Sequence, residues 1–169
     1  MEFTLPKKKP APTSSAIAKP IRFDSFERNF VRDMIFAAEV INGKLLRKNA
    51  ARGHTNIRMA FAPVLLHIAK AGTRAIDIAA QTNLSKQAIG KTVRNLEEIG
   101  YIYQETDSED ARNKYLKFTP KGLKLIADTQ IGVDEITRDL EQLIGKQKTR
   151  DLIETMALLV DKLNASAGD

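Results

Sequence analysis

Residues 85–100 (SKQAIGKTVRNLEEIG) carry side chains suited to binding a polyanion. Polar side chains and one glycine recur there at spacings that share one side of a helix: Lys86, Gln87, Gly90, Lys91 and Arg94. Lysine and arginine bind phosphates, arginine or lysine also pairs with guanine, and glutamine can pair with adenine. Acids follow only at the end of the stretch, as Glu97 and Glu98. A basic face that merely contacts solvent remains the alternative.

The same stretch predicts the helix that would present these groups. Ser85 is a favoured N-cap, because its hydroxyl can accept a bond from a free backbone N–H of the first turn. Apolar residues and a glycine recur at spacings of four, three and four, which places them on the inward face: Ile89, Val93, Leu96 and Gly100. A short apolar helix over 76–82 precedes it, so the pair predicts a helix-turn-helix.

A β-hairpin is predicted directly after this helix. Residues 102–106 and 114–118 read as strands, and the polar segment between them reads as the tip. The order helix, helix, hairpin is that of a winged helix. Arg112 at the tip could enter a narrow minor groove while Asp110 holds it extended, and Lys114 and Lys117 could contact phosphates.

Four further helices are predicted from apolar periodicity, over 24–52, about 56–71, 120–144 and 149–163. We expect Asp24 or Ser25 to cap the first. Pro63 implies that the second either begins near Ala62 or kinks there. The stripe of the long C-terminal helix is expected to be Leu123, Ile126, Val133, Ile136, Leu140 and Leu143. The terminal helices have apolar stripes that must be buried, either within one chain or, as we favour, in a dimer.

The segment IDIAAQTNLSKQAIGKTVRNLEEIGYI, the hairpin and FTPKG together resemble the multiple-antibiotic-resistance regulator (MarR) family of winged-helix transcription factors. The resemblance covers about residues 57–160. It is most specific at the hairpin and the following helix: Asp107, Asp110, Arg112, Phe118, Thr119 and Gly122. Phe118 replaces the usual leucine, and Ala111 stands where the family usually has arginine or another polar residue, so the resemblance gives less support to an extended wing contact beyond Arg112.

The resemblance implies a mainly α fold with a small β-hairpin, in which residues 23–53 and 120–165 dimerise and 56–119 form the winged-helix lobe. It implies a homodimer that binds double-stranded DNA and regulates transcription, more often as a repressor than as an activator. A small anionic or aromatic effector is expected in the cleft between the dimerisation helices and the lobe. We expect its lining to include Phe30, Met34, Phe61 and His67; in the alternative, these residues belong simply to the core.

The composition of the chain narrows the range of possible functions further. The chain has 169 residues, a formal net charge of +6, no cysteine and two histidines, so we expect no disulfide, no metal, no cofactor and no enzymatic activity. Neither a membrane span nor a secretory signal is evident, which predicts a cytoplasmic protein. Residues 1–22 read as a disordered, proline-rich basic tail that is either a soluble extension or an arm touching DNA.

Two other functions fit the same residues. One is an architectural protein that binds DNA with little sequence preference. The other is a winged helix used for protein interaction. Salt dependence and competition with unrelated DNA separate them from a sequence-specific regulator.

Overall fold

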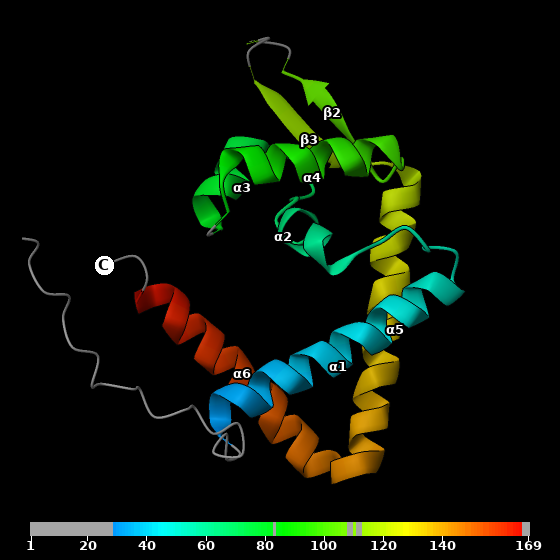
Figure 1. The fold of residues 1–169 in the computed structure, drawn as a ribbon, viewed down its shortest axis with the longest axis vertical. Coiled ribbons are helices and arrows are strands. Elements are labelled where there is room, and N and C mark those ends of the chain that lie inside the picture. The colour runs from blue at the N-terminus through cyan, green and yellow to red at the C-terminus, as the bar shows by residue number, and fades with distance from the viewer. Residues whose placement is uncertain (1–28, 83, 108–109, 111–112, 167–169) are drawn as a thin grey trace, which may run out of the picture.

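The computed structural model describes residues 29–82, 84–107, 110 and 113–166. Helices dominate it, and a small antiparallel sheet completes it (Figure 1). The elements follow in the order α1 (Phe30–Ala51), the 3-10 helix η2 (Met59–Phe61), α2 (Ala62–Leu65), β1 (Thr73–Arg74), α3 (Ala75–Gln81), α4 (Lys86–Glu98), β2 (Ile102–Thr106), β3 (Lys114–Phe118), α5 (Pro120–Ile144) and α6 (Lys146–Ser166). The predicted fold class is therefore confirmed.

The sheet has one more strand than the sequence predicts. The hairpin strands β2 and β3 pair antiparallel from Ile102 opposite Phe118 to Thr106 opposite Lys114, as expected. The short strand β1 pairs with the other edge of β3, which gives the strand order β1-β3-β2. A strand of two residues is too short to show an alternating pattern, so its existence depends on pairing with β3.

The core lies between α3, α4 and the sheet. Ile78, Ile89, Leu96 and Leu116 are fully buried, and Val93 is 4% exposed. The inward face predicted for α4 is thus confirmed. Each such side chain contributes about 1.5–3 kcal/mol through removal of its apolar surface from water, so this small core fixes the orientation of α4.

The first helix begins later than predicted. Helix α1 starts at Phe30, because Asn29 has an extended backbone and its side-chain oxygen accepts a hydrogen bond from the Arg32 N–H at 2.9 Å. The caps expected at Asp24 or Ser25 lie outside the described residues, as does the tail over residues 1–22. The predicted end is confirmed: the helix stops at Ala51, and Gly53 has a φ of +95°.

The helix expected over 56–71 is much shorter. Proline takes the first turn of α2, where its missing N–H costs nothing, and η2 precedes it. The first of the two alternatives, a start near Ala62, is confirmed. Continuation to residue 71 is wrong, because α2 ends at Leu65 and turns follow.

Helix α5 has the predicted bounds but buries a different stripe. Thr119 caps it by accepting from the Gly122 N–H at 3.1 Å, and Gly145 ends it. Of the predicted stripe, Ile136 is buried, whereas Leu123, Ile126, Val133 and Leu143 are exposed. The buried line is Gly122, Leu125, Gly132 and Ile136. The glycines let α5 pack closely against its neighbours. A Cβ at Gly132, for example, would lie 3.0 Å from the Leu45 side chain on α1.

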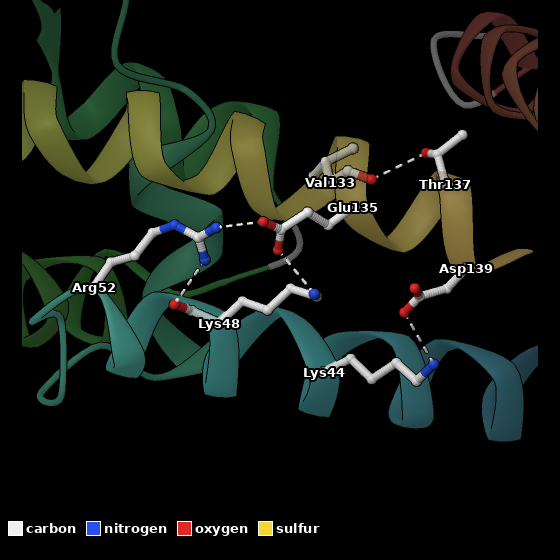
Figure 2. A network of polar contacts seen from close by, with 7 residues as sticks. All are labelled: Lys44, Lys48, Arg52, Val133, Glu135, Thr137 and Asp139. Carbon is white, nitrogen blue, oxygen red and sulfur yellow. Dashed lines mark hydrogen bonds and ion pairs between the residues drawn. The ribbon is translucent and has the colours of Figure 1, made fainter.

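A charged network joins α1 to the middle of α5 (Figure 2). Glu135 accepts from Lys48 at 2.8 Å and from Arg52 at 2.7 Å, and Lys44 lies 3.5 Å from Asp139. The hydrogen bond from Lys48 lowers the pKa of Glu135, and the positive charge of Arg52 lowers it further. The cations near the end of α1 therefore pair with α5 in addition to any favourable interaction with the helix dipole.

Helix α5 links two ends of the molecule. Figure 1 shows α4 and the hairpin at one end of α5, while α6 begins at the other end and runs away from it. Helix α6 begins at Lys146, three residues before the predicted start at Thr149. Large apolar side chains remain exposed on the first half of α1 and along α6: Phe30, Val31, Ile35, Phe36, Leu152, Ile153, Leu158, Val160 and Leu163.

Candidate nucleic-acid interface

The outward face of α4 presents the predicted binding residues together. Ser85 begins the helix by accepting from the Ala88 N–H at 3.2 Å. The side chains of Lys86, Gln87, Lys91 and Arg94 are all exposed. A Cβ at Gly90 would meet only the end of the Arg94 side chain, at 3.7 Å, so nothing from the rest of the described chain covers this face.

The charges on this face are left for an external partner. Lys86, Lys91 and Arg94 form no ion pair with any residue that the structure describes. Glu97, by contrast, accepts from the side-chain amide of Gln104 on β2, at 2.9 and 3.1 Å. Glu97 is thereby turned toward the hairpin. Glu98 is exposed at the last residue of α4, so the first turns of the helix, with Lys86 and Lys91, carry the positive charge suited to phosphates.

The described part of the hairpin is stabilised largely by its own polar groups. Lys114 is exposed on β3, whereas Lys117 forms an ion pair with Glu105 across the strands. The hydrogen bond from Lys117 to Glu105 raises the pKa of Lys117. Lys117 is therefore engaged within the hairpin rather than free for phosphate. Arg112 lies outside the described residues, and the Asp110 carboxylate accepts from the side-chain amide of Asn113 at 3.3 Å.

Arg74 is a positioning residue that sequence reasoning missed. Its guanidinium donates two hydrogen bonds of 2.8 Å to Asp77 in the first turn of α3. A third nitrogen–oxygen contact, 3.5 Å long, reaches Asn113 at the base of the hairpin tip. The bond from Arg74 lowers the pKa of Asp77. The spacing of three between Arg74 and Asp77 suggests the ion pair, but no sequence signal links either residue to the hairpin.

A buried polar cluster holds the end of α4 against the long helices. His54 is 4% exposed; its Nδ1 lies 3.0 Å from the Tyr101 hydroxyl and its Nε2 lies 2.9 Å from the Asp128 carboxylate. Because a carboxylate only accepts, Nε2 carries a hydrogen, and in the neutral ring Nδ1 accepts from Tyr101. Burial raises the pKa of Tyr101. Hydrogen bonds from Lys124 and then His54 lower the pKa of Asp128.

Tyr101 is positioned from several sides. Its N–H closes the end of α4 by donating to Leu96 at 2.9 Å, after Gly100 with a φ of +76°. Its ring lies 4.4 Å from the Lys121 ammonium, which also donates to the Ile99 carbonyl at 2.7 Å. The end of α4 is therefore connected through His54 to the segment that follows α1, and through Lys121 to α5.

The four residues expected around an effector do not surround one described cavity. Phe30 is 67% exposed and Met34 is half-buried, both on the first half of α1. Phe61 belongs to the buried core, and His67 bonds the Pro63 carbonyl at 2.7 Å. A cavity of about 220 Å³ lies elsewhere, between the second half of α1, the η2–α2 segment and α5.

Two classes of site are not found among the residues that the structure describes. No group of three or more histidines and acids there is placed to hold a metal ion. Within the same residues, no helix is both long enough and apolar enough to cross a bilayer.

The fold matches winged-helix structures over most of the chain. The S. aureus MepR–DNA complex gives a TM-score of 0.62 at 19% identity, over 80% of this chain and 99% of that chain. A crystal structure of MarR gives 0.60 at 24% identity, over 80% and 95%. The helix-turn-helix with its sheet therefore defines a winged-helix protein.

Sequence comparison finds similarity to one family over part of the chain. The family model described as "MarR family" matches residues 62–113, which include all of α4 and β2 and end just before β3. A regulator named HTH-type transcriptional regulator FarR, from Neisseria gonorrhoeae, is 30% identical over 92 residues, or 53% of this chain. The matched part is 63% of FarR, less than two-thirds of its length. The match over residues 62–113 and the fold make this chain similar to MarR-family regulators.

Proposed function

We propose that the chain is a homodimeric, sequence-specific regulator of transcription that binds double-stranded DNA through α4. The exposed face of α4 carries this proposal, because its three cations form no ion pair among the described residues, while Glu97 bonds the hairpin and Glu98 lies at the far end of the helix. The FarR relative is named a transcriptional regulator, and the MepR structure is a complex with DNA. Both support the same function here.

The proposal assigns a role to each residue of the interface. Gln87 reads a base edge in the major groove, while Lys86, Lys91 and Arg94 neutralise phosphates or pair with guanine. Ser85 lies at the N-terminus of α4, where the helix dipole favours a phosphate. Gly90 lets the backbone approach the DNA closely. Arg112 and Lys114 extend the contact from the hairpin, with Arg112 in the minor groove.

The exposed apolar surface of the terminal helices supports a dimer. Phe30 and Phe36 on α1 are each 67% exposed, and Leu163 on α6 is 60% exposed. Large apolar side chains exposed on these helices are a common mark of an interface. A two-fold pair would place its two α4 helices on half-sites about 34 Å apart. Sedimentation should give a dimer, and Phe36→Asp should shift it toward monomer without loss of helicity.

Regulation is the second part of the proposal. A dimer bound at a promoter excludes polymerase, so we propose repression. A small effector bound between the long helices and the winged-helix lobe (residues 56–119) would change the spacing of the two α4 helices and thus their fit to DNA.

Binding to DNA fragments selected from the source genome, measured at several salt concentrations, tests the function. The wild-type protein should lose affinity steeply as salt rises, because each phosphate contact adds about 0.9 to the slope of log K against log salt. Lys91→Ala should weaken binding to every DNA sequence and lower the slope of log K against log salt by about 1. Gln87→Ala should mainly change base preference. Lys162→Ala on α6 removes the same charge far along the chain and is the matched control.

The same measurement separates the alternatives. An architectural protein would bind selected and random DNA equally, and a protein-interaction module would bind neither at low salt. If Lys91→Ala and Gln87→Ala both behaved like Lys162→Ala, the assignment of α4 as the recognition helix would be wrong.

A further inference from the structure

The winged-helix lobe joins the long helices α1 and α5 mainly at one junction. Among the described elements, close backbone contact between the lobe and these helices occurs mainly where β3 leads into α5. Figure 1 shows the lobe at one end of α5. A lobe attached in this way is free to turn about the junction unless side chains set its angle.

Three buried side chains cross the junction and together form what we name the joint. Tyr101 belongs to the lobe, His54 to the segment that follows α1, and Asp128 to α5. Tyr101 is 1% exposed, His54 is 4% exposed, and the side chain of Asp128 is 13% exposed. The ring nitrogens of His54 lie 3.0 Å from the Tyr101 hydroxyl and 2.9 Å from the Asp128 carboxylate. Both ring nitrogens are therefore engaged, one on each side of the junction.

The joint resists rotation of the lobe, because each of its parts is fixed from behind. The backbone N–H of His54 donates to the Asn49 carbonyl at 2.9 Å, which attaches the ring to the end of α1. Lys124, one turn earlier on α5, donates to the Asp128 carboxylate. If the lobe turned, the hydroxyl of Tyr101 would leave His54, and two buried polar groups would lose their partner. That cost lowers the population of turned lobes by about tenfold or more.

We infer that the joint fixes the angle of the lobe relative to α1 and α5, and that His54 and Tyr101 are thereby positioning residues for the half-site spacing that the dimer accepts. The selection of spacing rests on the proposed function, whereas the fixed angle does not. One inserted base pair moves a half-site by about 3.4 Å and turns it by about 35° around the duplex. A lobe of fixed angle cannot follow that change.

Distances between spin labels test the angle without DNA. The chain has no cysteine, so labels can be attached to cysteines that replace the exposed residues Gln81 on α3 and Gln142 on α5. Dilution with unlabelled protein leaves only pairs within one chain. His54→Met removes both bonds of the ring and should broaden the distribution of distances. His54→Gln should keep the narrow distribution, because an amide can accept from Tyr101 and donate to Asp128.

DNA with the preferred half-site spacing, and the same DNA with one base pair inserted between the half-sites, tests the selection. The wild type and His54→Gln should each lose about tenfold or more in affinity on insertion. His54→Met should lose less than about threefold. Gln130→Met is the matched control, since it removes a side-chain hydrogen bond of 2.9 Å that stays within α5, and it should behave like the wild type. A purely structural role for His54 would lower stability and leave the ratio of the two affinities unchanged.

Equal distance distributions for the wild type and His54→Met would overturn the fixed angle. A loss of tenfold or more on insertion in His54→Met, as in the wild type, would overturn the selection of spacing by the joint. If His54→Met fails to fold, Tyr101→Phe replaces it, because this change removes only the hydroxyl and has the same expected outcomes. A narrow distance distribution in a protein that binds no DNA would refute the proposed function and leave the fixed angle standing.

Discussion

Replacing Gly122 by alanine should strongly destabilise the protein. A Cβ at this position would lie 2.0 Å from the backbone oxygen of Tyr101 and 2.9 Å from Cδ1 of Phe118. The first neighbour is backbone and cannot rotate away. The start of α5 must therefore separate from the segment that leads from α4 into β2.

The size of the effect follows from these contacts. Overpacking that shifts backbone costs about 1–3 kcal/mol. The Tyr101 oxygen also accepts from the Thr119 N–H at 3.0 Å and from its hydroxyl at 3.2 Å. Weakening these two bonds adds about 1 kcal/mol each. Alanine's better helix propensity returns about 0.5–1 kcal/mol. The net loss is about 2–4 kcal/mol, or a fall in Tm of about 10 °C.

Urea unfolding followed by far-UV circular dichroism should show this loss as a lower midpoint with an unchanged slope. All variants must be compared at one protein concentration, because dimerisation would link stability to concentration. Gly90→Ala is the matched control: the added Cβ has free space, so it should raise the free energy of unfolding by about 0.5–1 kcal/mol. The same change should weaken DNA binding, because it adds bulk to the side of α4 that is proposed to face DNA.

A Gly122→Ala protein within about 1 kcal/mol of the wild type would refute the close approach of α5 to Tyr101. A Gly90→Ala protein with reduced stability would contradict the open outward face of α4.

Two further perturbations probe the contacts between the long helices and the lobe. Tyr101→Phe leaves Nδ1 of buried His54 without its partner and should lower the free energy of unfolding by about 1–3 kcal/mol. The same change at Tyr103, 42% exposed on β2, should alter it by less than about 0.5 kcal/mol; equal losses would contradict the buried contact. Glu135 has a lowered pKa when folded, so its stabilisation is full above its ordinary pKa of 4.5 and disappears as pH falls through the folded value. Glu135→Gln should therefore make the free energy of unfolding depend less steeply on pH below about pH 4.5. If the variant lost stability with falling pH as steeply as the wild type, the ion pair of Glu135 with Lys48 would have no part in that loss.

Local patterns were sufficient to predict most of the helices and the face of α4 that is buried. Ser85 and Thr119 cap helices where their side chains and the following residues indicate. The strands 102–106 and 114–118 match the structure at both ends. These features depend on interactions within a few residues of one another, so a single sequence contains the information that specifies them. The expected outward residues of α4 are exposed for the same reason.

Such local patterns could not predict contacts between segments that lie far apart in the sequence. Sequence spacing predicted Leu123 and Val133 as inward residues of α5, but the close approach of α1 made Gly132 part of the buried line instead. The partners of His54 lie 47 and 74 residues away. The cavity at Asn49 likewise joins three elements that no local pattern connects.

The sequence by itself determined which helix is basic, how it is capped and which of its sides is apolar, because these depend on residue type and a period of 3.6. Only the tertiary structure decided how that helix is held, since the approach of α1 to α5 depends on the shapes of side chains far apart in the chain. That packing buries His54 between Tyr101 and Asp128 and leaves the oxygen of Asn49 without a protein partner among the described residues.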